Sequence, residues 1–215
     1  MSRPLLISDC DEVLLHMVTH FAQWLDEAHA IRFDLAAPGF RDALTDRETG
    51  LRVGEERVWP LLDGFFDTQM HRQNVVAGAA EALARIGEVA DIVVLTNIGD
   101  AYQAGRMEQL AAFGIHHRVL CNRGGKGRPV IELIEEMRPS MTVFVDDLPV
   151  HHESVAKHAP DVWRLHMVAE PLMAGHVRPA PFAHARIDDW ETATDWILDR
   201  MGAAEPAPSM GLGEE

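Results

Sequence analysis

The sequence predicts an α/β fold: a three-layer, Rossmann-like parallel sheet with a small α-helical domain inserted near the N-terminus. Short apolar runs rich in β-branched residues alternate with amphipathic helical patterns, which is typical of parallel strands joined by crossover helices. Three of these runs end on acidic or hydroxyl residues, as strands do at the ligand-binding edge of an open parallel sheet. Residues 14–74 carry helical patterns without a comparable run, which predicts the insertion.

The predicted strands are short apolar runs bounded by turn residues. Each is apolar almost throughout, because parallel strands covered by helices on both faces have no solvent-exposed side. The third run in the chain is the weakest, since it contains histidine and arginine. The predicted strands are Leu5–Asp9, Ile92–Asn97, His117–Cys121, Thr142–Asp147 and Val162–Met167.

Amphipathic patterns between these runs predict the helices that pack on the sheet. The second helix carries Ala104, Met107 and Leu110 on its expected core face, and Gly114 is placed to end it. The third helix begins with a proline, which suits the first turn. The predicted helices are Ala77–Gly87, Ala101–Phe113, Pro129–Met137, Val150–His158 and Trp190–Met201.

Two apolar stripes at helical spacing predict that the insertion is a small helical bundle with its own core. The stretch between the two stripes is polar, and Pro-Gly and Thr-Gly pairs at residues 38–39 and 49–50 interrupt it. The stripes are Met17, Phe21, Trp24 and Leu25, followed by Trp59, Leu62, Phe65, Phe66 and Met70.

The domain organisation follows from these patterns. Residues 1–13 and 75–202 form the predicted core, with a Pro-rich loop at 170–181, and residues 14–74 form the insertion. Residues 203–215 are rich in Gly, Pro, Ala and Glu, which predicts a disordered tail.

Composition excludes several kinds of partner. The net charge of −15 over 215 residues argues against a nucleic-acid polymer, because phosphate backbones require a basic face. No apolar run approaches the ~20 residues that span a bilayer, and the N-terminus shows no signal-peptide pattern, so we expect a cytoplasmic protein without a membrane partner. Cys10 and Cys121 lack a Cys-x-x-Cys spacing and are interpreted as buried thiols. The oligomeric state stays open, with a homodimer as one candidate.

Four short motifs carry side chains suited to one site. The carboxyl ends of parallel strands meet at one edge of a sheet, so we expect the motifs to converge there. Carboxylates, an ammonium group and a hydroxyl together suit a phosphate group and a magnesium ion. The motifs are Asp9 and Asp11, then Thr96 and Asn97, then Lys126 in a Gly-rich turn before a helix, and lastly Asp146 and Asp147.

Each motif alone also has an ordinary structural interpretation. Paired aspartates are common in turns, and Asp146 or Thr96 could cap the helix that follows its strand. Lys126 alone could be a solvated loop residue. His151 and His152 lack a zinc-binding spacing and are interpreted as surface residues. Four motifs in this order, three of them at strand ends, favour catalysis.

In this order the motifs resemble those of the haloacid dehalogenase-like (HAD) superfamily, most of whose members transfer phosphoryl groups. The resemblance extends from about Pro4 to Met201 and implies that the insertion is a cap over the site. Glu12 departs from the commonest pattern, which has Gly at this position. Capless protein phosphatases of the superfamily do carry Glu there, but they have no insertion of this size.

The resemblance implies two catalytic carboxylates and a phosphate-binding set. Asp9 would be the nucleophile that forms an aspartyl-phosphate, and Asp11 would protonate the leaving oxygen and then activate water. Thr96, Asn97 and Lys126 would bind the transferring phosphoryl group.

The resemblance also implies a magnesium site. Asp9, Asp147 and the main-chain carbonyl of Asp11 would hold Mg²⁺, while Asp146 would bind it through water or orient Lys126.

The predicted function is therefore that of a Mg²⁺-dependent phosphomonoesterase. Its substrate would be a small phosphorylated metabolite, either a nucleotide or a sugar phosphate. Dehalogenases lack an acid at the position of Asp11, and phosphonate hydrolases need a cap lysine, which the insertion lacks. Two alternatives stay open: a phosphomutase, and a catalytically slow HAD-like binding or regulatory module. Cap arginines such as Arg47 and Arg52 are expected to influence substrate choice.

Overall fold

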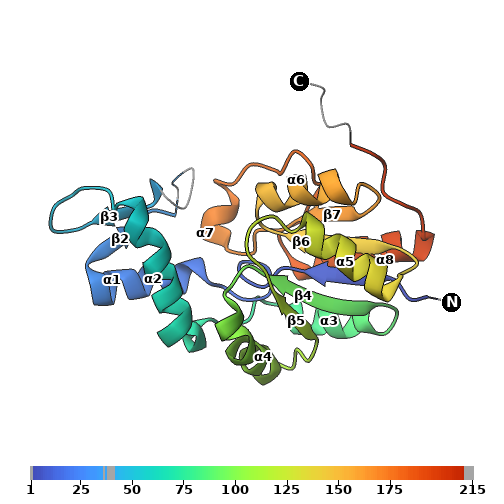
Figure 1. The fold of residues 1–215 in the computed structure, drawn as a ribbon, viewed down its shortest axis with the longest axis horizontal. Coiled ribbons are helices and arrows are strands. Elements are labelled where there is room, and N and C mark those ends of the chain that lie inside the picture. Colours follow the sequence, from blue (N-terminus) through green and yellow to red (C-terminus); the bar gives the residue numbers. More distant parts are fainter. Residues whose placement is uncertain (1, 36, 38–41, 211–215) are drawn as a thin grey trace.

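The computed structural model describes residues 2–35, 37 and 42–210, and its main feature is a six-stranded sheet in which all neighbours are parallel (Figure 1). The strand order is β5-β4-β1-β6-β7-β8. This confirms the predicted fold class, and only the two-residue β8 was too short to be predicted. The strands are β1 (Leu5–Ser8), β4 (Asp91–Thr96), β5 (Arg118–Cys121), β6 (Thr142–Asp146), β7 (Trp163–His166) and β8 (Ala185–Arg186).

Helices cover both faces of the sheet and make the three layers. Side chains alternate across a strand, so Leu6 packs on one face while Leu5 and Ile7 pack on the other. The first face is covered by α3 (Ala79–Gly87) and α8 (Trp190–Ala203), and the second by α5 (Gly127–Met137) and α6 (Pro149–His158).

The helix next to β5 turns a different face inward from the one predicted. A short 3₁₀ turn, η3 (Asp100–Tyr102), leads into α4 (Gln103–Ala112). Within α4 only Arg106 and Leu110 are buried, whereas Ala104 and Met107 are exposed. The prediction was right for Leu110 and wrong for Ala104 and Met107, because a buried ion pair, described below, holds Arg106 inside.

The segment predicted as a Pro-rich loop contains one helical turn, α7 (Pro171–Ala174). The Glu170 side chain caps this turn by accepting a hydrogen bond from the amide of Leu172 at 3.1 Å. Proline at the first helical position suits such a start.

The apolar residues of the insertion form a third cluster, apart from the two clusters of the sheet, and Ile98 of the core joins it. Phe21 lies fully buried in it and meets Phe65 edge to face, with ring centroids 5.4 Å apart. The insertion is not purely helical, because β2 (Ile31–Phe33) and β3 (Leu44–Asp46) pair antiparallel. Its helices are α1 (Val18–His29), α2 (Glu55–Thr68) and the 3₁₀ turn η2 (Met70–Arg72).

Two details of the insertion differ from the predicted stripes. Trp59 is half exposed rather than part of the core, and Val58 and Leu61 take the inward positions of α2. The first stripe is buried as predicted, with Phe21, Trp24 and Leu25 all inside. The domain boundaries at residues 13–14 and 74–75 stay a prediction.

The two segments that join the insertion to the core run beside each other. His16 donates its amide hydrogen to the carbonyl of Asn74 at 2.9 Å, and Val76 donates to the carbonyl of Leu14 at 2.8 Å. Leu15 and Val75 form an antiparallel bridge between these two bonds. The outgoing and returning chains therefore make a short two-stranded ribbon.

Part of the predicted disordered tail packs on the core. Trp163 donates its indole hydrogen to the carbonyl of Glu205 at 2.8 Å, and Ala207, which is buried, donates to Asp161 at 3.0 Å. The rest of the tail, residues 211–215, lies outside the described residues. Within the described part of the chain, no helix is long and apolar enough to cross a membrane.

Candidate active site

Three of the four motifs lie at the ends of three adjacent strands. β1 pairs with β4 on one side and with β6 on the other, so Asp9, Thr96 and Asp146 come to the same edge of the sheet. The amide of Asp9 donates to the carbonyl of Val145 at 2.8 Å, which extends the ladder one residue past β1. Parallel pairing in register is what brings these side chains together.

Lys126 reaches the same edge from the turn before α5. Its Nζ lies 2.8 Å from Asp9 Oδ1 and 2.7 Å from Asp146 Oδ2, and its side chain is fully buried. Gly127 allows the start of α5 to pack closely against α6, because a Cβ there would lie 2.3 Å from the carbonyl oxygen of Ser154 on α6. Burial alone would lower the pKa of Lys126, but the carboxylates of Asp146 and Asp9 outweigh burial and raise it.

Asp9, Asp146 and Asp147 form an acidic cluster whose ligand oxygens lie within 4.8 Å of one another. Burial, reinforced by the neighbouring carboxylates, raises the pKa of Asp147 well above its ordinary value. Burial also raises the pKa of Asp9, although Lys126 opposes it. Three carboxylates face one ammonium group, and a divalent cation would balance the remaining charge. Oxygen ligands of this kind could hold a divalent metal ion.

Two buried histidines hydrogen-bond to the main chain of the acidic pair. Nε2 of His152 lies 2.9 Å from the carbonyl oxygen of Asp146, and Nε2 of His166 lies 2.8 Å from that of Asp147. Burial lowers the pKa of His152 to about 3, so its ring is neutral and donates through Nε2. The interpretation of His152 as a surface residue was wrong, because its side chain has no exposed area. The two rings fix the main chain that carries the acidic pair.

Asp11 is held by two residues far along the chain, one in α4 and one just after η2. Nη2 of Arg106 on α4 lies 3.0 Å from Oδ1 and 3.1 Å from Oδ2, and Gln73 donates to Oδ1 at 2.7 Å. Arg106 is fully buried, and its Nη1 also lies 3.2 Å from Oε1 of Gln73. Sequence reasoning missed both residues, because an arginine and a glutamine give no local signal of a partner far along the chain.

Thr96 and Asn97 stand beside this network. Oγ1 of Thr96 is 3.4 Å from Oδ2 of Asp11, and the Asn97 side chain donates to the carbonyl of Gly124 at 2.9 Å, in the turn before Lys126. Nε2 of His151 lies 3.3 Å from the Asn97 amide nitrogen. His151 was also predicted at the surface but is buried. Its proximity to Asn97 adds a titratable ring to the edge of the site.

The insertion arginines singled out from the sequence lie elsewhere. Arg47 pairs with Asp26 and Arg52 pairs with Asp42, and all four side chains are more than two-fifths exposed. These surface ion pairs occupy both guanidinium groups within the insertion.

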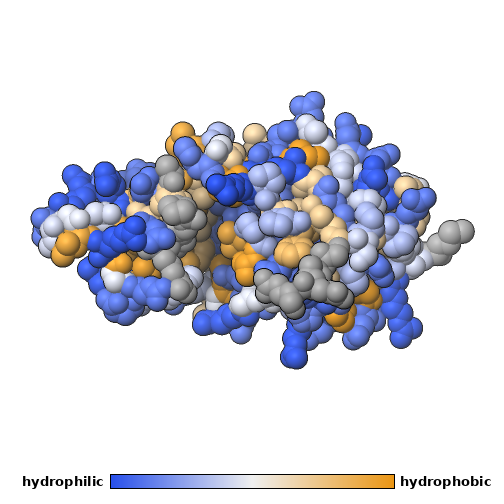
Figure 2. Space-filling view, turned by 90° about the horizontal axis from the view of Figure 1, so that it is seen from above, coloured by the Kyte–Doolittle hydropathy of each residue, from blue (hydrophilic) through white to orange (hydrophobic). Residues whose placement is uncertain are grey.

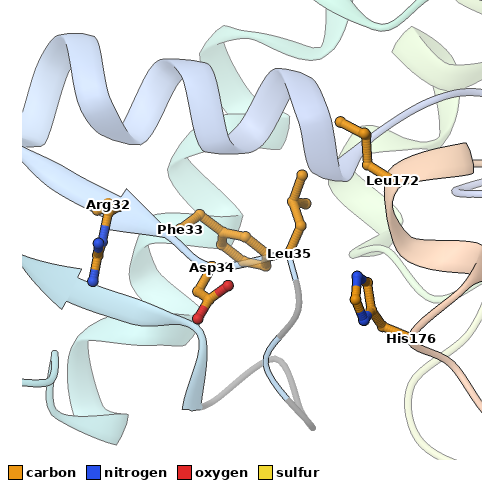
Figure 3. Close-up of a pocket in the computed structure, with 6 residues that line it drawn as sticks. All are labelled: Arg32, Phe33, Asp34, Leu35, Leu172 and His176. Carbon is orange, nitrogen blue, oxygen red and sulfur yellow. The ribbon is translucent and has the colours of Figure 1, made fainter.

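A pocket of about 360 Å³ lies between the insertion and the segment around α7 (Figure 3). Arg32, Phe33, Asp34 and Leu35 line it from the insertion, and Leu172 and His176 face them. Figure 2 shows one face of the molecule hollowed between the insertion and the core, with hydrophobic residues gathered along the hollow. None of the lining residues belongs to the four motifs, so this pocket is separate from the acidic cluster.

Comparison with known proteins gives likeness in structure alone. No family model and no curated protein matches the chain. A HAD family hydrolase from Deinococcus radiodurans, solved with bound phosphate and sodium, is similar with a TM-score of 0.66 and 15% identity over 94% of this chain and 98% of that one. A candidate HAD-hydrolase from Bacillus subtilis bound to magnesium is similar with a TM-score of 0.61 and 12% identity, covering 92% and 100% of the two chains.

A haloacid dehalogenase-like family hydrolase from Xanthomonas campestris is also similar, with a TM-score of 0.58 and 16% identity over 94% of this chain and 98% of that one. These matches extend over nearly the whole of each chain and therefore include the insertion as well as the sheet. The chain thus has the fold of the haloacid dehalogenase-like hydrolases.

Proposed function

We propose that this protein is a Mg²⁺-dependent phosphomonoesterase that acts on a small phosphorylated metabolite through an aspartyl-phosphate. The observation that carries the proposal is the convergence of Asp9, Asp146 and Asp147 with the buried Lys126 at the ends of β1 and β6. This set combines a nucleophile, ligands for a hard cation and a fixed positive charge. The HAD-like fold is consistent with it.

Asp9 is positioned to act as the nucleophile. Its backbone is fixed by β6, and its Oδ1 accepts from the amide of Cys10 at 2.7 Å and contacts Lys126. Oδ2 is then the oxygen that attacks phosphorus. The P–O bond to the leaving group breaks as the aspartyl-phosphate forms, and water later cleaves the new bond and releases inorganic phosphate.

Asp11 would move the proton in both half-reactions. It would enter the reaction protonated, give that proton to the leaving oxygen, and then, as the carboxylate, take a proton from the attacking water. Arg106 and Gln73 hold its carboxylate in one orientation, so they are positioning residues. Thr96 lies next to Asp11, and its hydroxyl would donate to the transferring phosphoryl group.

Asp9 and Asp147, with Asp146 through water, would hold the Mg²⁺, and the ion would neutralise phosphate charge. Lys126, whose ammonium group contacts Asp9 and Asp146, would stabilise the same charge. The predicted contribution of the Asp11 main-chain carbonyl to the metal site stays a proposal. The insertion would act as a cap that excludes water and selects the substrate.

Hydrolysis of a generic aryl phosphate tests the proposal. We expect turnover with Mg²⁺, loss of turnover in excess EDTA and recovery when Mg²⁺ is restored. Activity that survives full chelation, or inactivity toward a broad panel of phosphate monoesters, would rule out the proposed function. Inactivity toward the whole panel would instead favour the alternative of a catalytically slow binding or regulatory module.

A phosphomutase would share the same nucleophile and metal site. A candidate β-phosphoglucomutase from Thermotoga maritima is similar in structure, with a TM-score of 0.59 and 13% identity over 91% of this chain and 99% of that one. Conversion of one hexose phosphate to its isomer without release of phosphate would identify a mutase, because the phosphoryl group would return to the sugar instead of passing to water.

Replacing Lys126 with methionine should lower kcat about a hundredfold for every substrate, because the charge that develops on the phosphoryl group is common to all of them. Steady-state kinetics over several phosphate esters would measure this. Lys157→Met is the matched control, since Lys157 is the only other lysine and is half exposed beside Glu153. A loss confined to one substrate would contradict the assignment.

A further inference from the structure

A second group of potential metal ligands lies where the core meets the insertion. One carboxylate oxygen of Glu12, a ring nitrogen of His16 and one carboxylate oxygen of Glu170 all lie within 4.8 Å of one another. Nδ1 of His16 is 3.4 Å from Oε2 of Glu170. Glu12 follows β1, His16 lies just before α1, and Glu170 precedes α7, so three separate segments supply the group.

Each of the two glutamates caps a helix through its Oε1 atom. Oε1 of Glu12 accepts from the amides of Met17 and Val18 at 2.7 and 2.6 Å, which satisfies free amides at the start of α1. Oε1 of Glu170 accepts from Leu172 at the start of α7. The Oε2 atoms take no part in this capping.

Two of the three potential ligand atoms have no hydrogen-bond partner among the described residues, and the third has one. Glu12 is only 2% exposed, and its Oε2 is buried without a hydrogen-bond partner. Nδ1 of His16 is buried and likewise has no hydrogen bond. Oε2 of Glu170 accepts from the Thr19 hydroxyl at 2.6 Å. A buried acceptor without a partner is costly, and such atoms in native proteins call for a missing ion, water or proton.

The charge of the group is also unbalanced. Among the residues that the structure describes, no lysine or arginine forms an ion pair with Glu12 or Glu170, and His16 is the one basic side chain beside them. Two largely buried carboxylates without a cation are unfavourable, because removing a charge from water is offset only by a close opposite charge.

We propose that Glu12, His16 and Glu170 bind a first-row divalent transition-metal ion, such as Zn²⁺ or Mn²⁺, at a site distinct from the acidic cluster of Asp9, Asp146 and Asp147. An imidazole nitrogen beside two carboxylates suits these ions, whereas Mg²⁺ takes oxygen ligands almost alone. The 3.4 Å separation of Nδ1 and Oε2 suits two ligands of one ion at roughly 2.0–2.2 Å from each.

Such an ion would have a structural role. It would tie the loop after β1 and the start of α7, both parts of the core, to the entrance of α1 in the insertion. Glu12 adopts a left-handed backbone conformation, with φ of +60°, that glycine accommodates best. Capping of α1 through Oε1 accounts for one oxygen of the glutamate at this strained position, and a ligand role would account for the other.

Pulsed electron paramagnetic resonance of the full-length protein with Mn²⁺ alone would test the proposal. The acidic cluster offers only oxygen ligands, so a directly coordinated ¹⁴N reports the new site without reference to enzyme activity. We expect the nitrogen signal in the wild-type protein, its displacement by Zn²⁺, and its loss in His16→Gln. Equilibrium dialysis should show Zn²⁺ affinity at this site falling at least about tenfold in the same variant.

His20→Gln is the matched control, because His20 bonds to Asn74 outside the group and should keep the signal. Among the described residues, the His16 side chain makes no hydrogen bond, so His16→Gln removes only its contact with Glu170. Glu170→Gln, which retains the capping oxygen, provides a second variant. Absence of coordinated nitrogen in the wild-type protein, or its persistence in His16→Gln, would overturn the proposal.

Discussion

Asp9→Asn is expected to reduce phosphatase turnover by at least about a thousandfold, because an amide cannot form the aspartyl-phosphate. Folding should survive the change. Burial raises the pKa of Asp9, so the charged carboxylate is held at some cost, and Lys126 keeps its second partner Asp146 at 2.7 Å. Single-turnover kinetics together with thermal unfolding would measure both effects.

The matched control is Asp91→Asn. Asp91 begins β4 at the opposite end of the sheet and is half exposed beside Arg3, so its loss should leave turnover unchanged. Substantial activity in a folded Asp9→Asn protein would show that another group attacks phosphorus. Equal losses in the two variants would show that the effect is one of folding.

Arg106→Leu is expected to lower the free energy of unfolding by about 3 kcal/mol, because breaking a buried ion pair leaves its partner charge unpaired. The affected partner is Asp11, whose side chain is only 14% exposed and would retain two neutral donors, Gln73 at 2.7 Å and Thr96 at 3.4 Å. The guanidinium also packs over the Phe66 ring at 5.5 Å from its centroid, and this contact would be altered as well. Urea denaturation would measure the change.

Two variants separate the ion pair from simple packing. Arg85→Leu removes an exposed pair with Asp195, and such surface pairs contribute at most about 1 kcal/mol. Arg106→Lys keeps the positive charge but loses the planar two-hydrogen contact, so its cost should lie between the other two. An Arg106→Leu protein as stable as Arg85→Leu would contradict the importance of this pair.

The sheet was predictable because parallel strands leave a strong local signal. Runs such as Leu5–Ser8 and Thr142–Asp146 are buried on both faces, and their hydrophobicity is continuous. The strands β2 and β3 of the insertion were missed because each has three residues and only one is fully buried in each. Short strands of this kind form through pairing with each other, which local sequence does not reveal.

The site was predictable only in part. Asp9, Lys126 and Asp146 follow motifs with a fixed order, and the structure brings them within hydrogen-bonding distance. The helical pattern placed Met107 in the core, but Arg106 is the buried residue. The reason is its ion pair with Asp11, which lies 95 positions away in the chain. Burial of a charged residue depends on that distant partner, so helical periodicity points to the wrong face.

The paired segments that join the insertion to the core limit how the insertion can move. A single connecting chain can rotate about its own bonds, whereas two chains hydrogen-bonded through His16–Asn74 and Leu14–Val76 resist rotation about their common axis. The remaining easy movement is bending of the ribbon across its flat face. Any opening and closing of the insertion relative to the core would therefore follow one hinge direction. A disulfide placed across the ribbon would leave this bending possible and would prevent rotation of the insertion about the ribbon axis.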